Sequence, residues 1–350
     1  MQLIKDIRVI AQQLGSSQFS SPRDLVARMG AIQAQDYAMA KWAVGIRLKS
    51  ATDKMVETAF NKGEILRTHV MRPTWHFVAA EDIRWMLKLS AERIKQSSVS
   101  RDRDLEITES LYTKVNGLLE KILQNNNYLT REDVGQELVK AGIAIDTSRM
   151  IHFMMRAEVE GIVCSGPVRG KKQTYALIEE RVVPMADLSK DEALASLASK
   201  YFRSHSPAGL QDFVWWSGLS VADARRAIDL IRTELIVDRF ASQNLLIHQS
   251  LGSVGKIADS LRFLPAFDEY VISYKDRTSV LALEHHPGAF TKNGIFYPIV
   301  MYKGQVVGSW KKSVKKKVLN VDTSFFESGF EVQEDLRSKA ENDFRYFMEA

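Results

Sequence analysis

The sequence contains very little cysteine, since Cys164 is the only one in 350 residues. A single cysteine cannot close an intrachain disulfide or supply a cysteine-based zinc site. Long apolar runs are also missing: no stretch approaches the roughly 18 apolar residues that a membrane-spanning helix needs. The N-terminal sequence MQLIKDIRVIAQQL mixes both charges and lacks the apolar core of a signal peptide. We therefore expect a cytoplasmic protein without membrane segments.

The short motifs of several enzyme classes are absent as well. The chain has no P-loop, no Rossmann glycine fingerprint, no G-x-S-x-G, no H-E-x-x-H and no H-x-E with P-C-x-x-C. The formal net charge is +5, a mild excess that permits a polyanionic partner without requiring one. The apolar fraction of 45% and the charged fraction of 26% are typical of globular proteins, and the length predicts two or three domains.

Three segments of the chain share one plan, in which two helices precede two short extended runs. Helix-start residues open a helix in each segment, at Ser21-Pro22, Thr130 and Ser220. Glycines such as Gly142 and Gly218 follow helical patterns as stop signals. Helix, turn, helix and hairpin is the order of a winged helix-turn-helix, whose second helix can enter the major groove of DNA while the hairpin wing reaches the backbone.

The sequence predicts an α+β fold with three tandem winged helix-turn-helix units and a small C-terminal β-barrel. Two long helical patterns link the first two units, and short β runs separated by turns such as Asn293-Gly294 follow residue 255. The expected domains are 1–100 with the first winged helix, 101–186 with a linking helix and the second, 187–252 with the third, and 253–350 with the barrel and a closing C-terminal helix.

Two amide side chains, Gln33 and Gln35, lie between the first two helical patterns in the segment Gln-Ala-Gln-Asp. One interpretation is that these polar residues cap free backbone groups at a helix junction. The other is a site, because amide carbonyls can orient a water molecule and amide NH2 groups can donate hydrogen bonds. Positions 33 and 35 of a regular helix point in different directions, so both can serve one pocket only if the site wraps around that turn or if the helix ends there.

Basic side chains gather on the predicted hairpins. In the first hairpin, Arg67 precedes a run in which alternation places Arg72, Thr74 and His76 on one face, provided that Pro73 keeps the register. These residues form either a phosphate- or base-contacting face or an ordinary surface strand. The histidines of this hairpin lack companions at a metal-binding spacing, so we expect no metal site.

Two further clusters are more strongly basic. The second hairpin tip carries Arg169, Lys171 and Lys172, and five lysines beginning with Lys311 and Lys312 lie between predicted strands near the C-terminus. Such clusters suit phosphate contact, although a solvated turn explains the hairpin tip equally well.

Two other groups of residues have structural interpretations. Trp215 and Trp216 are expected in the core. Asp268, Glu269 and Tyr270, together with Asp276 and Arg277, could form a buried ion-pair network.

Taken together, five segments carry a resemblance to a known family: AIQAQDYAMAKWAVGIRL, RTHVMRPTWHFV, GPVRGKKQTYALIEER, DFVWWSGLS and LPAFDEYVISYKDR. The chain resembles the winged-helix DNA-binding protein family that includes the AlkZ-like and YcaQ-like bacterial DNA glycosylases, from about residue 5 to about residue 320. The motif of that family is Gln-x-Gln or Gln-x-Asp, and Gln33 and Gln35 match the first form. The family pattern Arg-x-Thr-x-His occurs as Arg72-Pro-Thr74-Trp-His76.

The resemblance implies a DNA-repair N-glycosylase that excises N7- or N3-alkylated purines, crosslinked ones included, with Gln33 and Gln35 as catalytic residues. It further implies a basic concave surface for double-stranded DNA, no metal and no cofactor. We expect a monomer associated with the nucleoid. The alternative is a non-catalytic winged-helix DNA-binding protein or transcriptional regulator, which would bind DNA without releasing a base.

Overall fold

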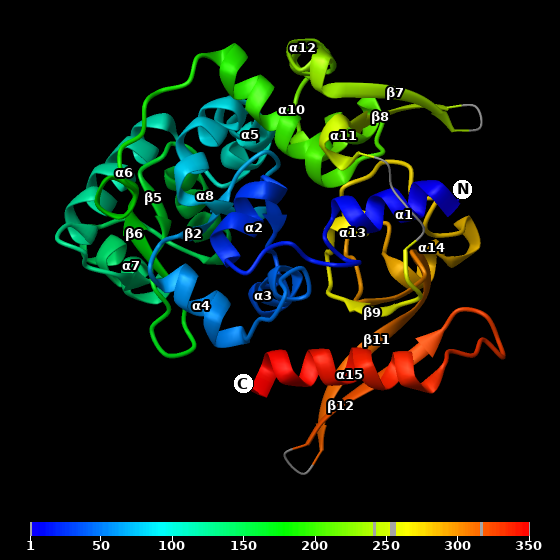
Figure 1. Ribbon diagram of the computed structural model, residues 1–350. Coiled ribbons are helices and arrows are strands. Elements are labelled where there is room, and N and C mark those ends of the chain that lie inside the picture. The colour runs from blue at the N-terminus through cyan, green and yellow to red at the C-terminus, as the bar shows by residue number, and fades with distance from the viewer. Residues whose placement is uncertain (1, 241–242, 253–256, 316–317, 350) are drawn as a thin grey trace. The chain divides into compact units, whose positions relative to one another are not determined.

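The computed structural model describes residues 2–240, 243–252, 257–315 and 318–349 of the chain (Figure 1). Two structural units divide the chain: unit 1 contains residues 1–57 and 194–350, and unit 2 contains residues 58–193. Helices and strands are mixed in both, which confirms the predicted α+β class. The four-domain division stays a prediction, because these two units group the chain differently.

Unit 2 consists of helices with two small antiparallel sheets. A hairpin pairs β2 with β3 in the register Thr68↔His76, and a three-stranded sheet has the order β4-β6-β5. The elements are β2 (Ile65–His69), β3 (Trp75–Ala79), α5 (Ile83–Asp104), α6 (Glu109–Leu123), β4 (Leu129–Thr130), α7 (Arg131–Lys140), α8 (Thr147–Val159), β5 (Val163–Ser165), β6 (Thr174–Leu177) and α9 (Ile178–Arg181).

Local capping explains where the helices of unit 2 begin. Thr130 and Asp133 form a reciprocal capping box at the start of α7. Asp146 caps α8 by accepting hydrogen bonds from the backbone N–H groups of Ser148 and Arg149. Gly142 follows α7 with a φ of +72°, a conformation that glycine adopts without strain. The predicted order of two helices and a hairpin is therefore present over residues 131–177.

One apolar core joins the helices of unit 2 to its three-stranded sheet. Leu119 and Leu123 of α6 pack with Val134 and Leu138 of α7, and Phe153 of α8 is fully buried in the same cluster. The two long helices predicted over 82–98 and 104–124 are α5 and α6. They thus belong to this unit as packed core helices.

Unit 1 combines the N-terminal helices with the last 157 residues of the chain, from residue 194 to residue 350. The first predicted winged helix is divided, since its helices α2 and α3 lie in unit 1 and its hairpin β2–β3 lies in unit 2. The N-terminal elements are α1 (Gln2–Ala11), α2 (Pro22–Met29), β1 (Ile32–Gln33), α3 (Tyr37–Gly45) and α4 (Asp53–Asn61), and α4 runs across the boundary.

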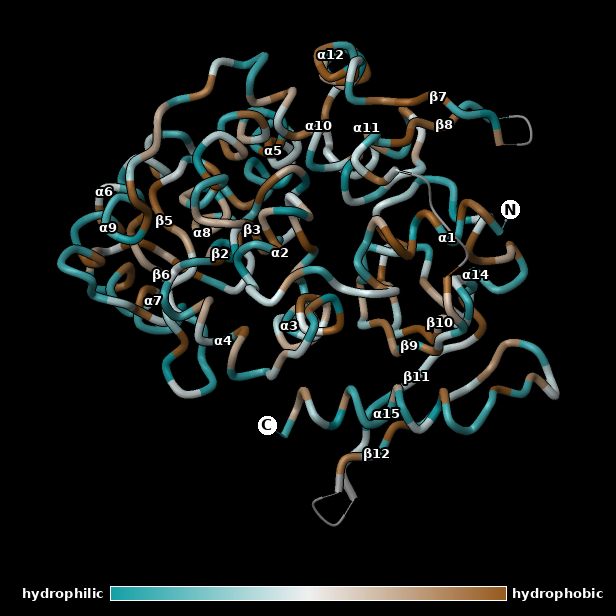
Figure 2. The backbone as a smooth tube through the Cα atoms, viewed as in Figure 1, coloured by the Kyte–Doolittle hydropathy of each residue, from teal (hydrophilic) through white to brown (hydrophobic). Residues whose placement is uncertain are grey.

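The third predicted helix–helix–hairpin segment is present in unit 1. Ser220 caps α12, and Gly218 ends α11 in the left-handed conformation. Strand β7 pairs only with β8 among the described residues, and Figure 2 shows hydrophobic residues along β7. The elements are α10 (Lys190–His205), which crosses the boundary, α11 (Leu210–Ser217), α12 (Val221–Leu230), β7 (Leu235–Phe240) and β8 (Gln243–His248).

The predicted C-terminal barrel is not confirmed. The described strands form one open antiparallel sheet of order β12-β11-β10-β9, in which the two outer strands are not paired with each other. The segments DEYVISY and SVLAL, expected as strands, form a short helix and turns. The elements are β9 (Leu261–Leu264), α13 (Glu269–Ile272), α14 (His286–Ala289), β10 (Ile299–Tyr302), β11 (Gln305–Lys315), β12 (Val318–Phe325) and α15 (Glu334–Glu349).

The C-terminal helix α15 closes one side of this sheet, as predicted. Phe344 packs edge-on against Trp310 of β11 and Trp42 of α3, with ring centroids 4.9 and 5.1 Å apart. The indole N–H groups of the two tryptophans donate to the backbone oxygens of Leu264 and Phe263 at 2.7 Å. The N-terminal helices and the C-terminal sheet therefore share one core within unit 1.

Candidate functional site

The Gln33-Ala34-Gln35-Asp36 segment forms the connection between α2 and α3. Helix α2 ends at Met29, and Gly30 turns the chain with a φ of +79°. Asp36 caps α3 by accepting a hydrogen bond from the backbone N–H of Met39 at 3.1 Å. The predicted helix junction is therefore confirmed for Asp36. Gln33 is the last residue of β1, and Gln35 lies in the bend before α3; we call the connection from Gln33 to Asp36 the Gln33 turn.

The two glutamines have different environments within this turn. Gln33 is buried, with 3% of its surface exposed, and its Oε1 accepts a hydrogen bond from the backbone N–H of Gln35 at 3.0 Å. Gln35 is exposed. The side chain of Gln33 thus holds the turn in shape, while Gln35 is the amide that an incoming molecule can reach.

A buried carboxylate supports the turn from within unit 1. Oε1 of Glu269 accepts the backbone N–H of Gln33 at 2.6 Å. Its Oε2 accepts hydrogen bonds from Nε1 of Trp216 at 3.1 Å and from Oγ of Ser273. Only 1% of Glu269 is exposed, so these donors replace the water that an ionised carboxylate requires. The sequence predicts a possible ion-pair network around Glu269, but its contact with Gln33 was not predicted.

The charge state of this cluster follows from burial and hydrogen bonding. Burial raises the pKa of Glu269, but the interactions with His205, Ser273 and the backbone N–H of Gln33 outweigh it and lower the pKa to about 2. Nε2 of His205 lies 3.5 Å from Oε2 of Glu269. Burial lowers the pKa of His205, which favours the neutral imidazole. A fixed negative charge therefore lies directly behind the Gln33 turn.

A second buried ion pair anchors the segment that carries Glu269. Nη1 and Nη2 of Arg47 donate to the two carboxylate oxygens of Asp268 at 2.8 and 2.7 Å, a two-pronged geometry that guanidinium favours. Asp268 also accepts the backbone N–H of Tyr270 and caps α13. The predicted buried ion-pair network is confirmed for Asp268 and Glu269, although Arg47 was not predicted as a partner and Asp276 is exposed. Trp216 is buried as expected, whereas Trp215 is 40% exposed.

The prediction that Arg72, Thr74 and His76 share one face of the first hairpin is wrong in part. Residues 71–74 lie in the turn outside both strands, where backbone hydrogen bonds join Arg72 N–H to the oxygen of Val70, and Thr74 N–H to that of Arg72, both at 2.7 Å. Pro73 has no N–H to donate to a strand ladder, and the tight turn replaces the alternation. His76 is fully buried, so its ring belongs to the interior of unit 2.

Other side chains of this hairpin are arranged around an aromatic residue. The guanidinium of Arg67 lies over the ring of Trp75, 4.2 Å from its centroid, and the ring of His69 lies 4.5 Å from that of Trp75. Nδ1 of His69 is 2.5 Å from Oε2 of Glu158, a buried carboxylate. Arg67 therefore stacks on its own hairpin, an arrangement that holds its charge in one place.

The basic tip of the second hairpin carries acidic partners. Arg169 pairs with Asp133 and Lys172 with Glu132, both carboxylates in the first turn of α7. Lys171 is exposed. Pairs between exposed side chains contribute only about 0–1 kcal/mol, so an incoming phosphate can replace the carboxylates at little cost. The structure thus brings the three predicted cations together and adds two carboxylates that were not predicted.

The C-terminal lysines are placed on the β11–β12 hairpin. Lys311 and Lys312 are exposed on β11, opposite Asp322 and Val321 of β12. The other three lysines of the predicted cluster, Lys315, Lys316 and Lys317, have side chains outside the described residues. The described part of the hairpin therefore presents two neighbouring positive charges.

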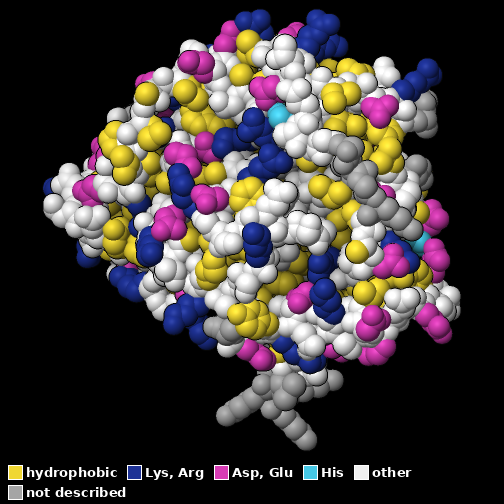
Figure 3. Space-filling model, viewed as in Figure 1, with side chains coloured by type: hydrophobic (Ala, Val, Ile, Leu, Met, Phe, Trp, Pro, Cys, Tyr) yellow, Lys and Arg dark blue, Asp and Glu magenta, His cyan; other side chains and the backbone are white. Residues whose placement is uncertain are grey.

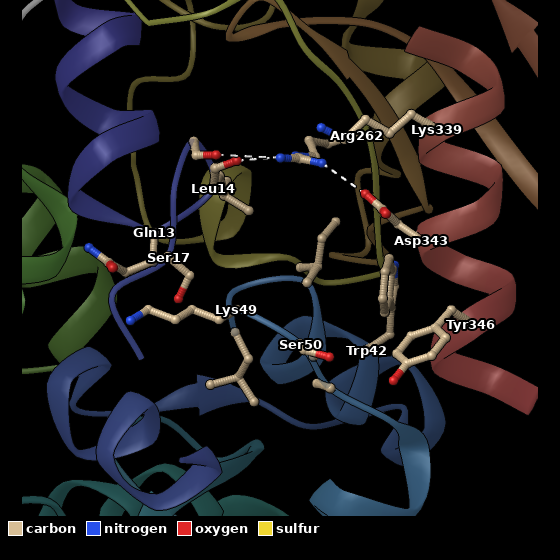
Figure 4. Close-up of a pocket in the computed structure, with 15 residues that line it drawn as sticks. Gln13, Leu14, Ser17, Trp42, Lys49, Ser50, Arg262, Lys339, Asp343 and Tyr346 are labelled. Atoms are coloured by element: carbon tan, nitrogen blue, oxygen red, sulfur yellow. Dashed lines mark hydrogen bonds and ion pairs between the residues drawn. The ribbon is translucent and has the colours of Figure 1, made fainter. Parts of the chain in front are cut away.

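The close-up in Figure 4 shows a pocket of about 430 Å³ that none of the predicted site residues line. Arg262 crosses it, donating to the backbone oxygens of Leu14 and Gly15 at 3.2 and 3.4 Å and to Asp343 at 3.2 Å. Lys49 and Tyr346 also line it. This pocket lies between α3, β9 and α15, and the Gln33 turn is not part of it.

Membrane spans and metal clusters are both absent from the described residues. None of the helices there is long and apolar enough to cross a membrane. In the same part of the chain, no group of three or more His, Cys, Asp or Glu side chains is placed to hold a metal ion.

Comparison with known proteins establishes the class. A family model described as "DNA glycosylase AlkZ-like" matches residues 26–342. The protein is thus a DNA glycosylase, a hydrolase that acts on N-glycosyl bonds in DNA. More narrowly, the chain belongs to the AlkZ-like DNA glycosylase family, which confirms the resemblance seen in the sequence.

Two comparisons, one of sequence and one of structure, show a likeness to DNA glycosylases of Streptomyces sahachiroi. The chain is 25% identical over 321 residues to an "Interstrand DNA cross-link repair glycosylase", and the match covers 84% of each protein. The solved structure of the DNA glycosylase AlkZ of that organism superposes with a TM-score of 0.81 at 21% identity, over 99% of this chain and 95% of the other. The second comparison shows that the two chains share a fold.

Proposed function

We propose that the protein is a monofunctional, metal-free N-glycosylase that excises N7- or N3-alkylated purines, including purines in crosslinks, and that it acts as a monomer. The observation that supports this proposal is the Gln33 turn, which presents an exposed amide at Gln35 and is held by a buried carboxylate at Glu269. Crosslink repair, the activity in the name of the Streptomyces relative, requires such a site to accept bulky bases.

The proposed chemistry suits glutamines because the substrate is already activated. Alkylation at N7 or N3 puts a positive charge on the purine, which weakens the glycosidic bond before the enzyme acts. Strong protonation of the leaving group is then unnecessary. The enzyme has to place a water near C1′ and stabilise the positive charge that develops on the sugar.

The two amides divide this work between them in our proposal. The carbonyl oxygen of Gln35 orients the attacking water and faces the developing charge. Gln33 positions Gln35 through the hydrogen bond from the Gln35 backbone N–H to its own Oε1. The carboxylate of Glu269 adds a negative potential behind the turn, which favours a cationic transition state over a neutral one.

DNA is held, in this proposal, by cations of both units. Arg169, Lys171 and Lys172 of the second hairpin and Lys311 and Lys312 of the β11–β12 hairpin contact backbone phosphates. These side chains are exposed or carry partners that phosphate can displace. Arg67, Arg72 and Thr74 of the first hairpin stay candidates for contacts near the lesion, whereas the burial of His76 leaves it a packing role.

A base-release assay tests the proposal. Duplex DNA containing N7-methylguanine, or a duplex with a purine crosslink, is incubated with excess protein, and a parallel reaction contains EDTA to remove any metal ion that could act in the hydrolysis. We expect free alkylated purine and an abasic strand in both reactions. The Gln35→Ala variant should bind DNA as well as the wild type and release no base. DNA binding without base release by the wild type would instead identify a non-catalytic DNA-binding protein.

A further inference from the structure

A pocket of about 370 Å³ in unit 1 is lined by basic side chains that the glycosylase mechanism does not use. Arg28 reaches it from the end of α2, and Lys200 and Arg203 reach it from α10, one helical turn apart. Figure 3 shows Lys and Arg side chains gathered beside a histidine over α10. We propose that this pocket binds a backbone phosphate of the DNA, an inference that rests on the proposed function.

The charges of the pocket favour an anion. Among the residues that line the pocket, three are cations and one, Glu234, is a carboxylate. Glu234 already accepts a hydrogen bond from Oγ of Ser199 at 2.8 Å and pairs with Nε2 of His248 at 2.9 Å. Arg203 lies 3.8 Å from the same carboxylate. The two arginines, Arg28 and Arg203, therefore give this pocket a concentrated positive charge.

The two arginines repel each other in the absence of an anion. Burial and the nearby charge of Arg203 lower the pKa of Arg28 to about 10, although a guanidinium normally stays charged at far higher pH. One of the five N–H donors of Arg28 is taken by the backbone oxygen of Arg203 at 2.8 Å. A phosphate between the two guanidiniums would relieve the repulsion and offer a pair of oxygens to the planar fork of a guanidinium.

The pocket is connected to the Gln33 turn through α10. Nζ of Lys200 donates to the backbone oxygen of Ala27 at 2.8 Å, so this helix is tied to the last turn of α2. His205, two residues beyond Arg203, lies against the carboxylate that holds the backbone of Gln33. A phosphate bound here would therefore be held by the same two segments that position the glutamines, which suits a contact close to the excised nucleotide.

These cations have a competing structural role, because positive charges near the carbonyl end of α2 also stabilise that helix. The salt dependence of binding separates the two roles. Each phosphate neutralised by a protein adds about 0.9 to the slope of log K against log salt for duplex DNA, whereas a helix cap adds nothing. The test uses undamaged duplex DNA, so it does not depend on base release.

The variants are Arg203→Gln, in the last turn of α10, and the double variant Arg28→Gln with Arg203→Gln. We expect each variant to weaken duplex binding about tenfold and to reduce the slope of log K against log salt by about 0.9, the value for one phosphate. Arg23→Gln removes an equal charge from α2 outside the pocket and should keep the wild-type slope.

An unchanged salt slope in Arg203→Gln, with or without a lower melting temperature, would overturn the phosphate site and leave the helix-capping role. Base release by the wild type, measured separately, decides the proposed function. A failure of the pocket and a failure of the glycosylase are therefore distinguished.

Discussion

The carboxylate of Glu269 is the group whose removal tests the site most directly. Three buried donors point at it: the backbone N–H of Gln33, Nε1 of Trp216 and Oγ of Ser273. Glu269→Gln keeps the shape and one acceptor oxygen, which can still receive the N–H of Gln33. Its NH2 group, however, replaces the oxygen that faces Trp216 and Ser273. The indole N–H of Trp216 then meets another donor, whereas the hydroxyl of Ser273 can rotate and accept a hydrogen bond.

The size of this effect follows from the donors that lose their acceptor. A buried donor left without an acceptor costs about 1–3 kcal/mol, and Glu269→Gln leaves at least the indole N–H of Trp216 in that state. The lowered pKa of Glu269 adds an effect of the same sign, because the ionised carboxylate favours the folded state near neutral pH and a neutral amide does not. We therefore expect a loss at the upper end of this range, about 3 kcal/mol, which is a large part of a typical total of 5–15 kcal/mol.

Urea unfolding and single-turnover base release measure the two consequences. Glu269→Gln should lose about 3 kcal/mol of unfolding free energy and should release base more slowly at unchanged DNA affinity, since Glu269 is buried and touches no DNA. Ser273→Ala is the matched control: it removes one donor, leaves the contact with Gln33, and should cost about 1 kcal/mol. An unfolding free energy for Glu269→Gln within about 0.5 kcal/mol of the wild type would refute the reasoning.

Two further predictions concern acid and the second hairpin. The pKa of Glu269 is lower in the folded protein, so the ionised carboxylate contributes fully to folding stability above about pH 4.5, and this contribution is lost as the pH falls through about 2. The difference in unfolding free energy between wild type and Glu269→Gln should therefore shrink over that window. A constant difference would contradict an ionised Glu269 in the folded protein. Glu132→Gln should release Lys172 for phosphate and tighten duplex binding about threefold, whereas Lys172→Gln should weaken it; equal binding by both would remove this hairpin from the DNA contacts.

The parts of the fold that the sequence predicts well depend on local chemistry. Ser21, Thr130 and Ser220 each cap the helix that follows them, because a hydroxyl oxygen accepts a backbone N–H three residues later. The hairpins after the second and third helix pairs are predicted equally well from short apolar runs. These signals act within a few residues, so they indicate structure without knowledge of the rest of the chain.

The wrong predictions of the fold have local causes. Asp268 begins a short helix by capping it, although the apolar alternation after it resembles a strand. Pro73 ends the alternation on which the shared face of Arg72, Thr74 and His76 depends. In both places a single backbone-directing residue outweighs the periodic pattern.

The contact between Glu269 and Gln33 could not be predicted from local sequence. Glu269 lies 236 residues beyond Gln33 along the chain, and nothing near either residue indicates that they meet. The available hint is an acidic pair, Asp268 and Glu269, within an otherwise apolar segment, which predicts buried charges but not their partners. Contacts between residues this far apart along the chain are set by the packing of a whole unit, which helix capping and hydrophobic periodicity do not describe.

The buried charge of Glu269 also explains why an amide suits position 33. Gln33 is buried beside this carboxylate and uses its Oε1 to accept the backbone N–H of Gln35. A glutamate at position 33 would supply the same acceptor but would place a second negative charge in the same water-poor region, which would raise the pKa of one of the two carboxyls. With one carboxyl protonated, the pair would carry the same single negative charge, but that charge would be shared between the two groups and would not be fixed on Glu269. A neutral acceptor at Gln33 keeps both the turn and the fixed charge of Glu269, whereas the exposed position of Gln35 carries no such restriction.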